Sequence, residues 1–166
     1  KSFGVKILTG VRIGQNKSIA DLEKAHEAIF IGAGLGSPSD LKIPGEELVG
    51  VIDALAFIEK VKAEKFSSVE VGKRVAVIGA GNTAIDAATE AKRLGAEQVM
   101  IIYRRSEAEM PAYEFEYELA KKDGIVFHFL TAPKRIIGNG FAEGIECVKM
   151  KLGKPDASSR RSPEPI

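Results

Sequence analysis

The sequence contains a single cysteine, Cys147, which excludes an internal disulfide and leaves no Cys-x-x-Cys pair for a metal or iron–sulfur site. A reducing compartment such as the cytoplasm is therefore the simplest location. Charge is nearly balanced, at 24 Lys and Arg against 23 Asp and Glu, so the basic signature of nucleic-acid-binding proteins is missing. No apolar run approaches the roughly 20 residues of a membrane-spanning helix. We expect neither nucleic acid nor membrane as a partner.

What the sequence does have is the composition of an ordinary globular domain. Apolar residues make up 45% and charged residues 28% of its 166 positions, which is enough for one sizeable core. The chain begins with Lys1 rather than methionine, and the segment 5–8 already has the pattern of a strand. We therefore expect the chain to be a fragment of a longer protein.

Strand-like and helix-like patterns alternate along the chain, which predicts an α/β fold. The expected strands cover residues 5–8, 28–31, 75–79, 99–103 and 125–130, and the expected helices cover 53–65, 83–94 and 112–122. Residues 135–137 and 144–150 are expected to form antiparallel strands joined at Asn139-Gly140, a strong hairpin signal. The sequence after residue 152 is polar and rich in turn residues, so an exposed loop or tail is expected there.

The stretch VAVIGAGNTA, residues 75–84, has the pattern of a strand-to-helix turn that binds a dinucleotide. In such a turn the first glycine permits the sharp bend, the second lets the backbone approach the pyrophosphate, and the third small residue lets the helix pack on the strand. Gly79, Gly81 and Ala84 occupy these places. A glycine-rich turn can also be purely structural. The strand before it, the helix after it and the next strand favour nucleotide binding.

The residues that follow the next expected strand indicate which dinucleotide is bound. An NAD site usually has Asp or Glu about 20 residues beyond the glycines, whereas an NADP site has arginine. Here the strand ends in Tyr103-Arg104-Arg105-Ser106, and the nearest acid, Glu107, comes later. Two guanidiniums and a hydroxyl suit a 2′-phosphate, so NADP(H) is the predicted ligand. The alternative is that the arginine pair is a solvated surface feature.

With these motifs the sequence resembles the NADPH-binding domain of the glutamate synthase small (beta) subunit and its flavin-dependent relatives, including NADPH–ferredoxin transhydrogenases. These proteins belong to the pyridine nucleotide-disulfide oxidoreductase superfamily. The matching segments, in order, are AIFIGAGLG, IPGEELVGV, VGKRVAVIGAGNTAIDAA, RLGAEQVMIIYRRSEAEMPA and MKLGKPDASSRRSPEPI. The resemblance implies a Rossmann-like three-layer domain, with a parallel sheet and added antiparallel strands, inserted into a split FAD domain. It also implies hydride transfer from NADPH to FAD in the full-length protein.

The resemblance further implies a division of the chain and a set of binding residues. Residues 1–45 would be a remnant of the FAD-binding half with a crossover linker, 46–152 the NADPH-binding domain and 153–166 an exposed tail. The nucleotide would contact the glycine turn and the end of the second strand, at Gly79, Ala80, Gly81, Asn82, Thr83, Arg104, Arg105 and Ser106. The implied partners are the FAD-binding halves of the parent chain and a glutamate synthase large subunit or ferredoxin-type acceptor subunit.

The sequence lacks the FAD glycine motif, the closing segment and the cysteine-rich region that many of these relatives carry around this domain. Gly32, Gly34 and Gly36 run into a proline-containing loop rather than a helix, so they are not expected to bind a second nucleotide. We expect the chain alone to bind NADPH without turnover, because it brings no flavin to accept the hydride. No catalytic or metal-binding residue is predicted. The alternative function is a nucleotide-binding interaction domain with no redox step.

A rival enzyme class is suggested by Tyr117 and Lys121, which spell the Tyr-x-x-x-Lys pair of short-chain dehydrogenases. One helical turn would place both side chains on one face, where the ammonium could lower the pKa of the phenol. Their position, on the helix directly after the second nucleotide-fold strand, is wrong for that family. An ordinary amphipathic helix is the preferred interpretation.

Overall fold

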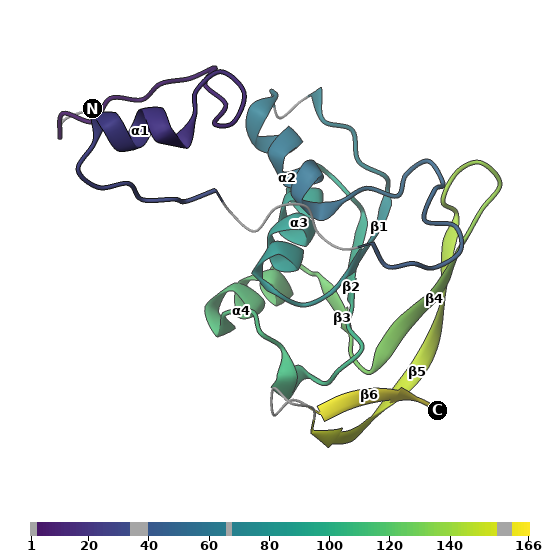
Figure 1. Cartoon of the computed structure of the whole chain (residues 1–166). Coiled ribbons are helices and arrows are strands. Elements are labelled where there is room, and N and C mark those ends of the chain that lie inside the picture. Colours follow the sequence, from purple (N-terminus) through teal and green to yellow (C-terminus); the bar gives the residue numbers. More distant parts are fainter. Residues whose placement is uncertain (1–2, 34–39, 66–67, 156–160) are drawn as a thin grey trace. The chain divides into compact units, whose positions relative to one another are not determined.

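The computed structural model describes residues 3–33, 40–65, 68–155 and 161–166. The chain divides into two compact units, Lys1–Gly36 and Ser37–Ile166. The second unit carries both β-sheets and the helices α2, α3 and α4, whereas the first carries the short helix α1 (Figure 1). Among the described helices, none has the length and apolar character needed to cross a membrane.

The described residues of the first unit, 3–33, have little regular structure apart from α1 (Ile19–Ala25). Ser18 caps this helix: its hydroxyl accepts a hydrogen bond from the Asp21 amide at 3.1 Å, and the Asp21 carboxylate accepts one from the Ser18 amide. The strands expected at 5–8 and 28–31 are not formed. Those two predictions are wrong because a strand needs a hydrogen-bonded neighbour, and no described segment of the chain pairs with either stretch.

The second unit is built around a parallel sheet, as the alternating pattern predicts. Its strands β1 (Arg74–Ile78), β2 (Gln98–Ile102) and β3 (Val126–His128) lie in the order β1-β2-β3. The connections between them contain α3 (Asn82–Arg93) and α4 (Glu114–Lys122). This is the β-α-β-α-β order of a dinucleotide-binding half, with the carboxyl ends of all three strands at one edge of the sheet.

The core of this unit lies where α3 packs on β1 and β2. Val99 and Ile101 of β2 are 2% and 0% exposed, and they face the alanine-rich side of α3, where Ala88 is 0% exposed. The small alanine side chains let the helix lie close to the strands. The helix ends as predicted, because Gly95 adopts φ +103° and its amide donates to the Lys92 carbonyl at 3.1 Å.

The helix α2 (Ala54–Ala63) packs on α3 and begins at the predicted cap, Asp53. The Asp53 carboxylate accepts a hydrogen bond from the Ala56 amide at 2.8 Å.

We expect Asp53→Ala to lower the free energy of unfolding by about 1 kcal/mol, because the amide loses this acceptor. Urea titration followed by circular dichroism measures the change. Glu59→Ala removes an exposed acid from the same helix and should change the stability by less than about 0.5 kcal/mol; an equal loss in both variants would contradict the capping role.

After β3 the chain forms an antiparallel sheet of β4 (Thr131–Ile137), β5 (Gly144–Pro155) and β6 (Arg161–Pro165). The predicted hairpin between β4 and β5 is confirmed, with Gly140 at φ +81° in its turn. The predicted α/β fold with a parallel sheet and added antiparallel strands is therefore confirmed.

The expectation of an exposed loop from residue 153 onward is wrong for the part that the structure describes. The strand β5 continues to Pro155, and β6 pairs with it from Arg161 opposite Pro155 to Pro165 opposite Met150. Prolines lack the amide that a central strand needs, but an edge strand can turn those positions away from its partner. Because prolines are rare in central strands, the prolines of β6 favoured the prediction of a loop, although the segment forms an edge strand.

Candidate nucleotide-binding site

The predicted glycine turn lies at the carboxyl end of β1, next to the end of β2. Gly79 adopts φ +114°, a conformation that side chains other than glycine rarely adopt, and its amide donates to the Ile102 carbonyl at 2.9 Å. A Cβ built on Gly79 would lie 3.8 Å from the Cβ of Ala84, which is buried. The first and third small residues of the motif are thus explained by the turn itself and by the packing of helix on strand.

The second glycine of the motif has no such backbone reason. Gly81 is the N-cap of α3 with φ −87° and ψ 175°, an extended conformation open to any residue. A Cβ added there would contact only the Cγ of Pro111, at an ordinary 3.9 Å. Close approach of a ligand to the backbone does explain a glycine at this place in a dinucleotide turn.

The amino end of α3 has the properties of an anion site. Its N-cap, Gly81, has no side chain to satisfy the first amides, and the first helical turn contains no acidic residue. The positive end of the helix dipole is therefore not neutralised locally. Thr83 is exposed beside it, whereas Ala80 is 2% exposed and offers only its backbone.

Asn82, the first residue of α3, connects this turn to the loop before α4. Its side-chain carbonyl accepts a hydrogen bond from the Tyr113 amide at 3.1 Å. The bond uses the oxygen of the side chain and leaves its NH₂ group as the donor toward an anion. Together with Pro111 beside Gly81, it places the loop 110–113 next to the glycine turn.

The four residues after β2 alternate between the interior and the surface. Tyr103 is 7% exposed, and its hydroxyl donates to the Glu109 carbonyl at 2.8 Å. Arg104 is exposed at the same sheet edge as the glycine turn. The structure therefore places Arg104 and the glycine turn at the same edge of the sheet, with the arginine side chain exposed.

Arg105 has a different environment from its neighbour. Its side chain is 7% exposed, and its Nε donates to the backbone carbonyl of Arg161 at 2.9 Å. Its own carbonyl accepts from the Leu130 amide at 3.0 Å. Arg105 thus ties the end of β2 to β6 and to the segment between β3 and β4, and its contact with a nucleotide phosphate stays a prediction.

Ser106 lies in a capping box with Glu109 at the start of the short 3₁₀ helix Glu107–Glu109. The amide and hydroxyl of Ser106 both donate to Glu109 Oε2, and the Nε of Arg161 donates to Glu109 Oε1 at 2.7 Å. The Ser106 hydroxyl, with a smaller contribution from Arg161, lowers the pKa of Glu109 below its ordinary value. Glu109 is therefore ionised at neutral pH, and both of its oxygens are occupied.

The pair Tyr117 and Lys121 does not form an acid–base site. Tyr117 is 7% exposed and packs edge-on against Phe127, with 4.7 Å between ring centroids. Burial raises the pKa of its phenol, whereas a proton-transfer role near neutral pH needs a lowered value. The Lys121 Nζ lies 4.3 Å from the ring centroid, over its face. These contacts support the interpretation of α4 as an amphipathic helix.

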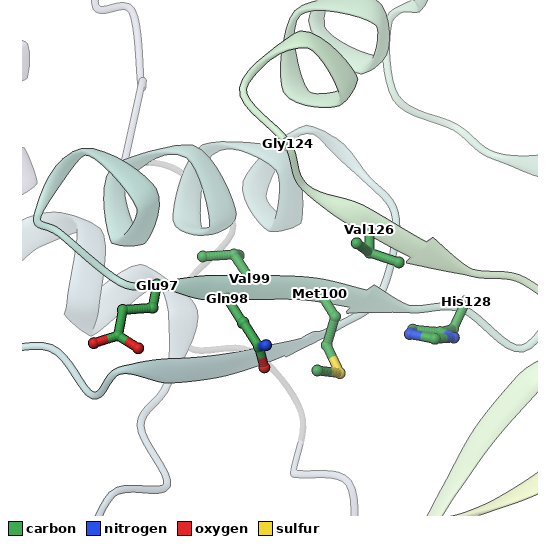
Figure 2. Close-up of a pocket in the computed structure, with 7 residues that line it drawn as sticks. All are labelled: Glu97, Gln98, Val99, Met100, Gly124, Val126 and His128. Carbon is green, nitrogen blue, oxygen red and sulfur yellow. The ribbon is translucent and has the colours of Figure 1, made fainter.

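A hollow on the parallel sheet lies apart from the glycine turn (Figure 2). Gln98 and Met100 project from β2 to one side of the sheet, whereas Val99 points to the other side, toward a helix. His128 of β3 also lines the hollow, which includes none of the predicted binding residues. Within the described parts of the chain, no group of three or more His, Cys, Asp or Glu residues could hold a metal ion.

A family model described as pyridine nucleotide-disulphide oxidoreductase matches residues 3–157. The chain belongs to this family. The resemblance inferred from the sequence motifs is therefore confirmed, and the motif VAVIGAGNTA lies within the matched part.

Curated relatives extend the family assignment. The beta subunit of NADP(+)-dependent formate dehydrogenase from Moorella thermoacetica is 40% identical over 169 residues, which cover 100% of this chain and 24% of that subunit. The glutamate synthase (NADPH) small chain of Halomonas elongata is 34% identical over 175 residues, which cover 100% of this chain and 37% of that one. The chain thus spans about a quarter to two-fifths of the length of these two relatives.

A solved structure of the same fold is FprA from Mycobacterium tuberculosis, determined in complex with NADPH. It matches with a TM-score of 0.72 and 22% identity, covering 93% of this chain and 49% of FprA. The match shows that nearly the whole of this chain shares the fold of about half of FprA.

The sequence reasoning missed two residues that the structure places at the end of β2, Glu109 and Arg161. A local signal for Glu109 exists, because Ser106 to Glu109 spells the Ser-x-x-Glu pattern of a capping box. No local signal could identify Arg161, which is 56 positions from Arg105 in the sequence and reaches it only through the pairing of β6 with β5.

Proposed function

We propose that this chain binds NADP(H) at the amino end of α3, as the nucleotide module of a flavin-dependent oxidoreductase. The observation that carries the proposal is Gly81, a glycine that the backbone does not require, at an uncapped helix terminus. The amides of the turn and the NH₂ of Asn82 would hold the pyrophosphate. Arg104, exposed at the same edge, would bind the 2′-phosphate through the N–H groups of its guanidinium.

The uncapped amino end of α3 and the exposed Arg104 support this nucleotide as the ligand, and we propose that the redox step takes place in the full-length protein. Bound NADPH would supply a hydride, and a flavin would accept it. Among the described α-helices, only α3 has a glycine as its N-cap, so we assign one nucleotide to this chain. We propose that FAD is held by FAD-binding halves of the parent chain, and that a glutamate synthase large subunit or a ferredoxin-type subunit takes the electrons. We also propose a reducing compartment such as the cytoplasm, with which the single cysteine of this chain agrees.

We expect Arg104→Ala to weaken NADP⁺ binding about tenfold and to leave NAD⁺ binding unchanged, because only NADP⁺ has the 2′-phosphate. Calorimetric titration of the chain with each nucleotide measures both affinities. Arg74→Ala is the matched control, since it removes an exposed arginine from the opposite end of β1. Equal affinities of the unaltered chain for NAD⁺ and NADP⁺ would contradict the 2′-phosphate assignment, and binding of neither would contradict the proposed function.

The second candidate function is a nucleotide-binding interaction domain without a redox step. The same glycine turn supports this function, but in it the bound nucleotide transfers no hydride. Addition of NADPH to the protein that contains this chain, purified with its flavin, separates the two: bleaching of the flavin absorbance supports the oxidoreductase. The chain itself, mixed with NADPH and a dye acceptor but no flavin, is expected to show no dye reduction.

A further inference from the structure

We propose that Arg161, the first residue of β6, is a second guanidinium of the 2′-phosphate site beside Arg104. The proposal rests on the NADP(H) site proposed above and deepens it, because it names a specificity residue outside the dinucleotide motif. Such a residue would belong to the antiparallel sheet rather than to the β-α-β unit that carries the glycine turn.

The first step of the argument is the location of Arg161. The buried side chain of Arg105 donates from its Nε to the carbonyl of Arg161 at 2.9 Å. Arg105 directly follows Arg104, so this bond fixes the start of β6 against the residues that end β2. The pairing of Arg161 with Pro155 holds β6 in that place from the other side.

The second step is the direction of the Arg161 side chain. Its Nε donates to Glu109 Oε1 at 2.7 Å, while the other carboxylate oxygen, Oε2, accepts from the amide and hydroxyl of Ser106. One carboxylate therefore bridges Arg161 and Ser106, and Ser106 lies in the loop that begins with Arg104 and Arg105. The guanidinium of Arg161 is brought to the same loop by this bridge.

The third step concerns what the guanidinium can still bind. Arg161 is about half exposed, at 48% of its side-chain surface, whereas Glu109 is 10% exposed. The carboxylate engages the Nε, and the terminal nitrogens of a guanidinium carry further N–H donors. A planar guanidinium can therefore bind a carboxylate along one edge and a phosphate along another. Among the residues that the structure describes, the exposed arginines at this edge are then Arg104 and Arg161, and Arg105 has the structural role between them.

A purely structural ion pair is the competing interpretation of Arg161. It predicts that loss of the guanidinium affects folding and all nucleotides alike. The proposed role predicts a selective loss for ligands that carry a 2′-phosphate. Two small ligands separate these outcomes, because 2′,5′-ADP and 5′-AMP share the adenosine and the 5′-phosphate and differ only at the 2′ position.

The test is calorimetric titration of the chain and of Arg161→Ala with 2′,5′-ADP and with 5′-AMP. We expect Arg161→Ala to weaken 2′,5′-ADP binding about five- to tenfold and 5′-AMP binding less than about twofold. The matched control is Arg135→Ala, because Arg135 is an exposed arginine of the same sheet whose Nε is likewise paired with a glutamate, Glu146. It should leave both affinities unchanged. Arg161→Lys keeps the positive charge but loses the planar set of N–H donors. It should therefore bind 2′,5′-ADP more tightly than Arg161→Ala and less tightly than the unaltered chain.

The outcomes distinguish this inference from the function on which it rests. If the unaltered chain does not prefer 2′,5′-ADP, the proposed NADP(H) site is wrong and Arg161 has no part in it. If Arg104→Ala loses the preference and Arg161→Ala keeps it, the site stands and the inference about Arg161 is overturned. If Arg161→Ala weakens both ligands equally and also lowers the melting temperature below that of Arg135→Ala, Arg161 is a structural residue.

Discussion

Replacing Gly81 with alanine is expected to weaken NADP⁺ binding about ten- to a hundredfold while leaving the fold nearly as stable as before. The conformation of Gly81 is open to alanine, and the added Cβ would meet only Pro111, at 3.9 Å. Alanine restricts the unfolded chain more than glycine does, which adds roughly 0.4–1 kcal/mol of stability. Alanine is also a poorer N-cap by a similar amount, so the two effects nearly cancel.

The expected loss of affinity has a separate cause. The methyl group of alanine would project from the backbone at the amino end of α3, where the pyrophosphate must approach the amides of the turn. Each hydrogen bond from a backbone amide to a charged phosphate is worth about 1.5–3 kcal/mol, so the loss of one accounts for the predicted range. If the turn were purely structural, an alanine at residue 81 would not affect nucleotide binding.

Two measurements on each variant check this prediction: a calorimetric titration with NADP⁺ and a urea unfolding curve. Gly144→Ala is the matched control, because a Cβ there would meet nothing within 4 Å and the residue opens β5. It should leave the NADP⁺ affinity unchanged and raise the stability by no more than roughly 0.4–1 kcal/mol, because alanine restricts the unfolded chain. Gly79→Ala should instead lose about 1–3 kcal/mol of stability, since Gly79 has φ +114°. Unchanged NADP⁺ affinity in a folded Gly81→Ala variant would falsify the assignment of the turn.

The substitution Ile101→Ala is expected to produce the largest loss of stability, about 2–5 kcal/mol. Ile101 is 0% exposed on β2, the strand between β1 and β3, and it belongs to the cluster that includes Ala88 of α3. Truncation would remove buried contacts from both layers and leave a cavity that the paired strands cannot close. Chemical denaturation measures the difference.

Two further variants keep this prediction testable even where the alanine variant does not fold. Ile101→Val removes one methylene group and should cost about 0.5–1.5 kcal/mol. Ile52→Ala, at a position 62% exposed, should change stability by less than about 0.5 kcal/mol. A loss at residue 101 no larger than that at residue 52 would show that the centre of the core lies elsewhere.

Local patterns predicted most elements of the second unit correctly because their causes are local. Asp53 caps α2 through an amide three residues away, and Gly95 ends α3 through a left-handed turn. The hairpin at Asn139-Gly140 follows from the same kind of turn chemistry. The wrong predictions all concern strands, at 5–8, 28–31 and 161–165. A strand forms only with a partner, and no described segment pairs with 5–8 or 28–31. At 161–165 the partner β5 is close in the sequence, but the prolines there favoured the prediction of a loop.

The sequence by itself determined the α/β order, the glycine turn and the arginine pair after β2, since each depends on residues within one helical turn or one strand. Only the tertiary structure separated the two arginines, placing Arg104 at the surface and Arg105 in the interior. It also brought Arg161 to Glu109, across 52 positions of sequence, through the pairing of β6 with β5. Burial and long-range pairing depend on how separate elements pack, and no local pattern of residues encodes that packing.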